Sequence, residues 1–179
     1  MRATQRTATA PGGDDTEDLR HFYTLTPDDL ALVDTVRGDG HCLALALTLV
    51  WARAERVMMA DPAALSAPVI AFVAIQLDLT PAALDGYHPS PTTHASDAAA
   101  VREHLGLRPF GQDEAARLRA HLHEKVANTG NTAALLDAAE DWLLHEGLLR
   151  PVGETTIERL MYAARAEAEE ALFTALAGR

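Results

Sequence analysis

Residues 41–56 read HCLALALTLVWARAER, and this stretch decides the fold. Its apolar side chains occupy every side of a helix, and Thr48 is the polar exception within the apolar run. A helix that is apolar all round has to be covered by other elements on all sides. The stretch therefore predicts a central, buried helix at His41–Arg56, around which a first core forms.

Further helices are predicted on both sides of this segment. Ahead of it, residues 26–29 (TPDD) supply a capping hydroxyl, a proline and two carboxylates, each at the place where a helix start favours it. That helix is expected to run to about Val36. No strand-like alternation of useful length is present, so the sequence predicts an all-α fold of about eight helices. The remaining helices are expected at Pro68–Leu77, Thr80–Leu84, Asp97–Leu105, Gln112–Ala127, Asn131–Leu144 and Thr155–Leu176.

The helices are expected to form two small packed subdomains with a helix-turn-helix-like character. Residues 1–20 mix threonine, glycine, aspartate and arginine without periodicity, so we expect a disordered N-terminal segment. Residues 87–96 hold two prolines and show no helical period, which makes them the best candidate for a linker. We therefore predict a first subdomain at 21–86 and a second at 97–179, which ends in a long amphipathic helix.

Composition and charge narrow the possible functions. Cys42 is the only cysteine, so the chain can form neither an internal disulfide nor a thiolate zinc cluster, as fits a reducing cytoplasm. The longest apolar stretch, residues 43–52, is too short to span a bilayer, and residues 1–20 lack the apolar run of a signal peptide. We expect a soluble, cytoplasmic protein without a membrane partner. Its net charge of -11 opposes non-specific attraction to DNA phosphates.

The charge is uneven along the chain. Residues 101–130 hold five bases against four acids, a positive balance, whereas residues 131–179 hold four bases against nine acids. Around and along the helix expected at Gln112–Ala127, the basic side chains resemble the basic face of a helix-turn-helix, although such spacing is more often plain solubilising surface. These side chains are Arg102, His104, Arg108, Arg117, Arg119, His121 and Lys125.

A catalytic alternative comes from residues 38–43 (GDGHCL), which are similar to the nucleophile segment of ovarian-tumour-type deubiquitinating cysteine proteases. Cys42 at the start of a helix is placed where the helix dipole lowers the pKa of a thiol. Such an enzyme also needs a distant histidine held by a polar partner, normally on a sheet, and no strands are predicted here. A protease with Cys42 as its nucleophile is therefore a minor alternative to a half-buried cysteine in the turn before a helix.

Metal and cofactor sites are not expected. His121 and His123 lie two positions apart, so their side chains point about 200° apart on a helix and cannot chelate one ion together. The many carboxylates stand in no recognisable catalytic pattern and fit solvated helix faces. We assign no catalytic residue, no metal ligand and no cofactor.

Four longer segments carry a resemblance to one known protein family. They are residues 22–33 (FYTLTPDDLALV), residues 71–84 (AFVAIQLDLTPAAL), residues 101–110 (VREHLGLRPF) and residues 156–176, which begin TIERL. In this order they resemble the N-terminal domain of the large replicative transposases of the Tn3 family. The resemblance extends over about residues 20–178, far more of the chain than the six-residue protease match.

The resemblance implies a helical module that recognises the terminal inverted repeats of a transposon, with double-stranded DNA as its partner. Cutting and joining belong in that family to a separate ribonuclease-H-like domain with three acidic metal ligands, which is expected to be absent here. The chain is therefore expected to bind rather than to react. The candidate DNA contacts are Arg37, His41, Arg102, His104, Arg108, Arg119, His121 and Lys125.

Two departures from the family pattern favour a second hypothesis. After Arg37, Gly38 and Asp39 the family typically continues with an asparagine and an arginine, where this chain has His41 and Cys42. Between residues 87 and 101 the family tends to carry several arginines that this chain lacks before Arg102. Because each lost phosphate contact lowers affinity, the alternative is a protein-interaction module that pairs with a full-length transposase or with a second copy of itself.

Overall fold

The structure, a computed structural model, describes residues 16–126, 131–151, 153 and 155–177. Within these ranges the chain is all helical, as predicted, and a single isolated bridge stands in place of any strand. Two short segments, η1 (Pro62–Ala64) and η2 (Pro81–Leu84), are 3-10 helices, and the second occupies the position of the predicted short helix. The α-helices of the described residues are α1 (Thr16–Tyr23), α2 (Pro27–Val33), α3 (Asp39–Glu55), α4 (Ala67–Gln76), α5 (Pro91–Leu105), α6 (Gln112–Val126), α7 (Thr132–His145) and α8 (Thr155–Ala177).

The chain divides into two compact units, an N-terminal unit (Met1–Leu105) and a C-terminal unit (Gly106–Arg179). This division follows α5, whereas the sequence placed a linker at 87–96, ahead of that helix. Residues 91–96 are helical instead, because Ser90 Oγ accepts a hydrogen bond from the Thr93 amide at 3.1 Å and caps the first turn. Pro91 is therefore a first helical residue, a position that suits proline, rather than part of a linker.

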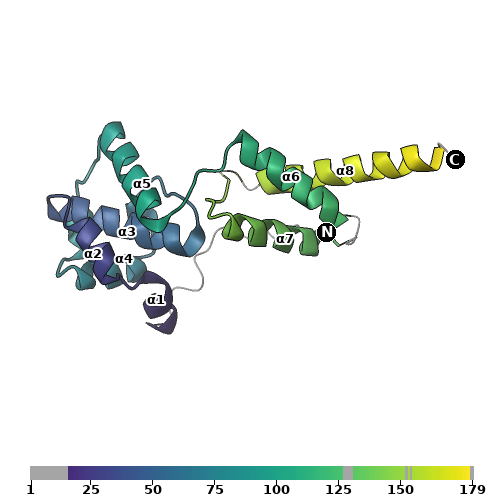
Figure 1. Ribbon diagram of the computed structural model, residues 1–179. Helices are drawn as coiled ribbons and strands as arrows, with labels where there is room; N and C mark the ends of the chain where they lie inside the picture. Colours follow the sequence, from purple (N-terminus) through teal and green to yellow (C-terminus); the bar gives the residue numbers. More distant parts are fainter. Residues whose placement is uncertain (1–15, 127–130, 152, 154, 178–179) are drawn as a thin grey trace. The chain divides into compact units, whose positions relative to one another are not determined.

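The N-terminal unit is built around α3, the central helix that residues 41–56 predict (Figure 1). Helices α1, α2, α4 and α5 pack against it or against one another, and η2 lies along it as well. The hydroxyl of Thr48, the polar residue within the apolar run, donates to the Ala44 carbonyl at 2.8 Å, so its burial leaves no unpaired donor. The side chains of α3 that are fully or almost fully buried include Leu43, Leu45, Leu47, Leu49, Val50 and Ala52.

Helix α1 corrects the expectation that residues 1–20 are disordered. Residues 1–15 lie outside the described ranges, but Thr16–Tyr23 is a helix that packs against α3 and α4. Leu19 and Tyr23, one turn apart, are both buried in the core of the N-terminal unit. With the partly buried Phe22 they form a short apolar face, too small to show a helical period beside a polar tail.

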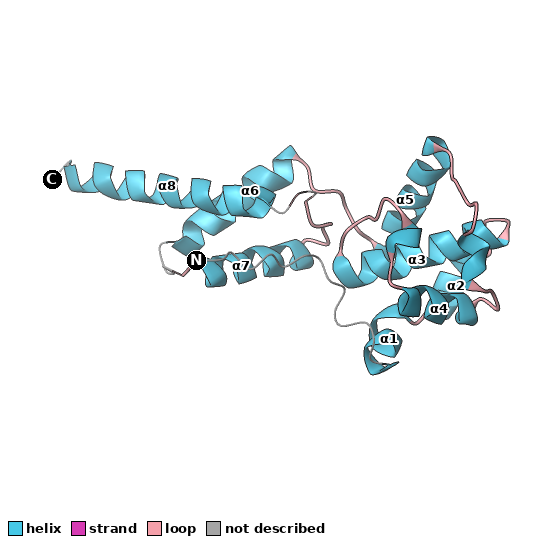
Figure 2. Ribbon diagram, turned by 180° about the vertical axis from the view of Figure 1, so that it is seen from behind, coloured by secondary structure: helices cyan, strands magenta, loops and turns pink. Residues whose placement is uncertain are grey.

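The C-terminal unit consists of α6, α7 and α8 (Figure 2). Helix α6 lies along α8 and also contacts α7. The chain between α7 and α8 is joined to the segment before α6 by two backbone hydrogen bonds of 2.9 Å, Arg108 N to Gly147 O and Leu149 N to Arg108 O. None of the described helices has the length and apolarity that crossing a membrane requires. The core of this unit contains Leu118, Leu122, Leu135, Ala139, Leu143, Leu148, Ile157, Met161 and Ala164.

Candidate nucleic-acid interface

Four of the predicted DNA contacts lie in the N-terminal unit and four in the C-terminal unit, so each set is described by itself. In the N-terminal unit, Arg37 is exposed in the turn between α2 and α3. Gly38, the next residue, adopts a φ of +90°, which glycine tolerates far better than other residues. Arg102 is half-buried near the end of α5. Neither arginine forms an ion pair with another described residue of the chain, so both guanidinium groups are available to bind an external anion.

His41 is bound inside the unit. Its Nε2 lies 2.9 Å and 3.0 Å from the two carboxylate oxygens of Asp97 on α5. Its ring is stacked on that of Tyr87, with a centroid separation of 5.6 Å and an interplanar angle of 26°. The side chain therefore ties the first turn of α3 to α5 instead of extending into solvent as a free donor.

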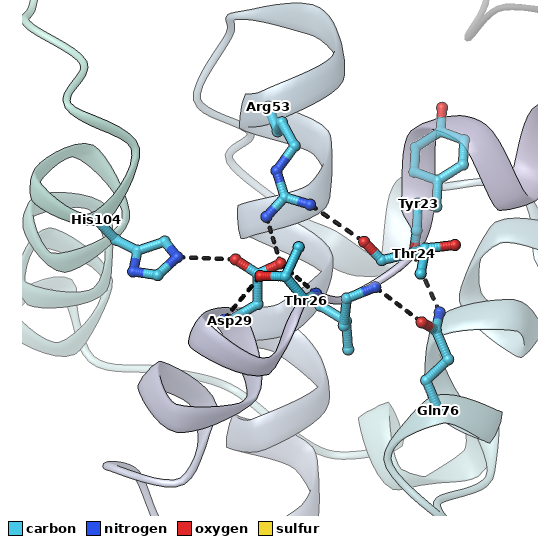
Figure 3. Close-up of polar contacts among 8 residues, drawn as sticks. Tyr23, Thr24, Thr26, Asp29, Arg53, Gln76 and His104 are labelled. Carbon is cyan, nitrogen blue, oxygen red and sulfur yellow. Dashed lines mark hydrogen bonds and ion pairs between the residues drawn. The ribbon is translucent and has the colours of Figure 1, made fainter.

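His104 belongs to a buried polar network centred on Asp29 (Figure 3). Asp29 is 1% exposed and accepts from the Thr26 amide at 2.7 Å, from Arg53 at 2.5 Å and from His104 at 2.8 Å. Burial raises the pKa of the Asp29 carboxyl, but these hydrogen bonds together outweigh it and hold the pKa below its usual range. One carboxylate thus joins the start of α2 to α3 and α5.

A second part of the same network holds the segment before α2. The amide side chain of Gln76, at the end of α4, accepts from Leu25 N at 2.8 Å and donates to Tyr23 O at 3.1 Å (Figure 3). Arg53 adds a hydrogen bond of 3.1 Å to Thr24 O. The chain leaves the helical hydrogen-bond pattern here, so side chains of α3 and α4 satisfy backbone groups of residues 23–25.

In the C-terminal unit, Arg108 precedes α6 and is half-exposed. Its Nη2 donates to the carbonyl of Glu146 at 3.0 Å and lies 3.5 Å from Oε2 of the same residue. Arg117, on α6, reaches that oxygen at 2.7 Å and lies over the ring of Trp142, 5.4 Å from its centroid. The sequence placed Arg117 on the outer surface but did not connect it with Glu146, because the two residues lie on different helices.

The remaining predicted contacts lie on α6. Arg119 is half-exposed and its Nε is 3.6 Å from Glu167 of α8. Lys125 is exposed near the helix end and forms no ion pair with any described residue. His121 is half-buried and its ring is tilted against Trp142 at 6.3 Å. Lys125 is therefore the freest of these cations, and Arg119 has a single exposed and weakly held counter-charge.

The surroundings of Cys42 argue against its role as a catalytic nucleophile. Cys42 is half-buried, and its Sγ is 3.9 Å from the Val36 carbonyl. Burial raises the pKa of the Cys42 thiol, and the carboxylates of Asp39 and Asp34 raise it further. The pKa is therefore raised where the sequence predicted a lowered one, because burial and two nearby acids outweigh the hydrogen bond from the backbone amide of Cys42. In the described part of the chain, no three side chains of His, Cys, Asp or Glu are grouped so that they could hold a metal ion.

Fold and site together define a two-unit, all-helical domain in which several basic side chains are paired with carboxylates, whereas Arg37, Arg102 and Lys125 form no ion pair with a described residue. The sequence matches the family described as Domain of unknown function (DUF4158) over residues 1–164, so the chain belongs to this family.

The chain is also similar to three transposases. It is 32% identical over 162 residues to the transposase for transposon gamma-delta of Escherichia coli (strain K12), which is 89% of this chain and 16% of that protein. It is 28% identical to the transposase for transposon Tn501 of Pseudomonas aeruginosa, over 98% of this chain and 18% of the relative. It is 26% identical to the transposase for transposon Tn1546 of Enterococcus faecium, over 87% of this chain and 16% of the relative.

These matches confirm the resemblance to the N-terminal domain of Tn3-family transposases. The chain spans between 16% and 18% of the length of these relatives.

Proposed function

We propose that this chain is a DNA-binding module of a transposition system and that it contacts the double-stranded ends of a transposon. The observation that carries the proposal is the similarity to transposases along 87–98% of the chain. A Tn3-type transposase must recognise the DNA that it moves, and a helical domain can do so without a catalytic site of its own. On this proposal the chain binds DNA, and strand cutting and joining require residues that it does not supply.

We divide the eight candidate residues into three groups by their contacts. Arg37, Arg102 and Lys125 form no internal ion pair among the described residues, so we assign them to direct phosphate contacts. His41 and His104 each form a hydrogen bond from a ring nitrogen to a carboxylate inside the N-terminal unit. We assign them to positioning α5, the helix that carries Arg102. Arg108, Arg119 and His121 are the remaining proposed contacts, and all three belong to the C-terminal unit.

The acidic net charge sets the strength expected of this binding. Arg108 and Arg119 are each within 4 Å of a carboxylate, so an incoming phosphate must compete with that intramolecular partner. Such exposed pairs are weak, about 1 kcal/mol or less, and they can exchange. We therefore expect modest affinity that falls steeply with salt, because the favourable term is counterion release from DNA.

A binding titration tests the proposal. Fluorescence anisotropy with a labelled duplex of transposon-end sequence, compared with a scrambled duplex of the same length, should show tighter binding to the end sequence at low salt. The double variant R102A/K125A should bind more weakly and should reduce the slope of log K against log salt by about 2, roughly one for each lost phosphate contact. Arg159→Ala is the matched control, an exposed arginine on α8 outside the proposed surface. Equal binding of the two duplexes would overturn recognition of transposon ends.

A second candidate function, an interaction module that pairs with another copy of the chain, is favoured by two exposed aromatic side chains on α8. Tyr162 is 65% exposed and Phe173 is 70% exposed. They are eleven residues apart, close to three full helical turns, so they share one face of the helix. Light scattering after size-exclusion chromatography, without DNA, would show a dimer that the Y162S/F173S variant loses. A monomer at all concentrations would exclude this function.

A further inference from the structure

Glu146 lies between two arginines at the end of α7. The Nη2 atoms of Arg117 and Arg108 lie 2.7 Å and 3.5 Å from the same oxygen, Oε2. Both arginine side chains are 52% exposed, whereas the side chain of Glu146 is 21% exposed. Two guanidinium groups that converge on one anionic oxygen, and are open to solvent, have the donor geometry that also binds a phosphate.

The two arginines are held in place without the carboxylate. Arg117 lies over the Trp142 ring at 5.4 Å, a cation–π contact that restrains the guanidinium group. The backbone of Arg108 is paired with Gly147 and Leu149 through two hydrogen bonds of 2.9 Å, and its side chain also donates to the Glu146 carbonyl. The pair of cations is therefore formed in advance, whichever anion lies between them.

Glu146, in contrast, stands where a carboxylate is disfavoured. It is the C-cap residue of α7, at the end of the helix where the helix dipole places a partial negative charge. The other acid of this cluster has a role of its own, because Glu114 accepts from Gly111 N at 3.0 Å at the start of α6. That bond and the one from its own amide lower the pKa of Glu114, and the nearby Arg108 and Arg117 lower it further. Glu146 is thus the exchangeable anion and Glu114 the structural one.

We propose that Arg108 and Arg117 form a binding site for one backbone phosphodiester of nucleic acid, and that the Glu146 carboxylate occupies this site in the free domain. On binding, the non-bridging phosphate oxygens accept from the two guanidinium groups, and the Glu146 side chain turns into solvent. The inference rests on the proposed DNA-binding function and adds both a contact, Arg117, and its regulation by an internal competitor. Because a phosphodiester carries no base identity, the site raises affinity for any sequence.

The alternative is a permanent salt bridge that only supports the fold. The two cases differ in what the substitution Glu146→Gln does to binding. If Glu146 competes with DNA, its substitution strengthens binding, because the arginines no longer have to break an ion pair first. A purely structural bridge that is removed leaves binding unchanged or weakens it.

The test uses the full chain and a labelled duplex of scrambled sequence, alongside the transposon-end duplex. E146Q should bind both about threefold to tenfold more tightly than the wild type and should steepen the salt dependence by about one unit of slope, the contribution of about one phosphate contact. Arg117→Gln should lower that slope by about one. In the R108Q/R117Q background, E146Q should give no more than the small change expected from net charge alone.

Glu140→Gln is the matched control, because it removes the same charge from α7, the helix that Glu146 caps, and the Glu140 carboxylate pairs with Arg150 instead. It should leave binding within the small change expected from net charge alone. An equal gain in E140Q and E146Q would overturn the inference, as would a gain that persists in R108Q/R117Q, and both results leave the proposed DNA binding intact. Absence of binding by the wild type and by E146Q would overturn both. Thermal unfolding of each variant confirms that the fold is kept.

Discussion

Nε2 of His104 lies 2.8 Å from Oδ1 of Asp29, although 75 residues separate the two in the sequence. The contact joins the last turn of α5 to the first turn of α2, and Arg53 brings α3 to the same carboxylate. Because α5 also carries Arg102, the buried acid Asp29 determines where a candidate DNA contact is placed. The structure therefore links the stability of the N-terminal unit to the geometry of its proposed contact surface.

Replacing Asp29 with asparagine should destabilise the N-terminal unit by about 2–3 kcal/mol. The substitution removes the charge that Arg53 and His104 face and turns an amide donor toward other donors. Chemical unfolding followed by circular dichroism measures the change. Asp28→Asn is the control, since the neighbouring acid in the same first turn is exposed, and it should change stability by no more than about 0.5 kcal/mol. Equal effects of the two substitutions would contradict the network.

The same carboxyl predicts a pH dependence. The pKa of Asp29 is lower in the folded state than in the unfolded chain, so the unfolded state binds the proton more tightly. This contribution to stability is complete above the ordinary aspartate pKa of about 4, and it is lost as the pH falls through the lower pKa of the folded state. Unfolding free energies measured across this acid range should fall less steeply in D29N than in the wild type. Parallel pH profiles would show that Asp29 does not contribute.

Much of the fold could be predicted from sequence because its signals are local. The all-apolar run at residues 41–56 and the threonine–proline start at Thr26 each specify an element through their own residues, and both elements are found. Helix α1 was not predicted because its two buried side chains are buried by contacts with α3 and α4, which lie farther along the chain. Pro91 was misread because a proline marks a break or a helix start according to the residue before it, here Ser90.

The candidate site was less predictable, for a different physical reason. Basic residues are visible in the sequence, but whether each is free depends on carboxylates that folding brings from far along the chain. His41 meets Asp97 across 56 residues, and Arg117 meets Glu146 across 29. The distance between two residues in the sequence does not predict such pairs. The sequence therefore identifies the basic side chains but not the carboxylates that pair with them. Arg37 and Lys125, which are exposed and form no ion pair with a described residue, are the candidates for which the sequence-based assignment needs least revision.

Gly40 should not tolerate even a methyl group. A Cβ at this position would lie 2.6 Å from the Ala83 carbonyl oxygen and 3.1 Å from Cβ of Tyr87, both on the segment that packs against the first turn of α3. Alanine normally stabilises a helix relative to glycine by about 1 kcal/mol, but here the overlap should reverse the sign and cost about 1–3 kcal/mol. Gly111→Ala is a useful comparison, because its Cβ would meet only the end of the Glu114 side chain. A G40A variant as stable as the wild type would contradict the close contact of α3 with η2.

The thiol of Cys42 should react slowly in the folded protein. Burial raises its pKa, Asp39 and Asp34 raise it further, and alkylation requires the thiolate, so less of the reactive form is present at any neutral pH. We expect iodoacetamide to modify the native chain more slowly than the same chain in denaturant, where Cys42 is exposed and far from a fixed acid. The D34N/D39N variant should react faster than the wild type in the native state and at the same rate in denaturant, which separates the charge effect from access. Labelling of native Cys42 as fast as in denaturant, or faster, would contradict the raised pKa and restore a nucleophilic cysteine as a function to be considered.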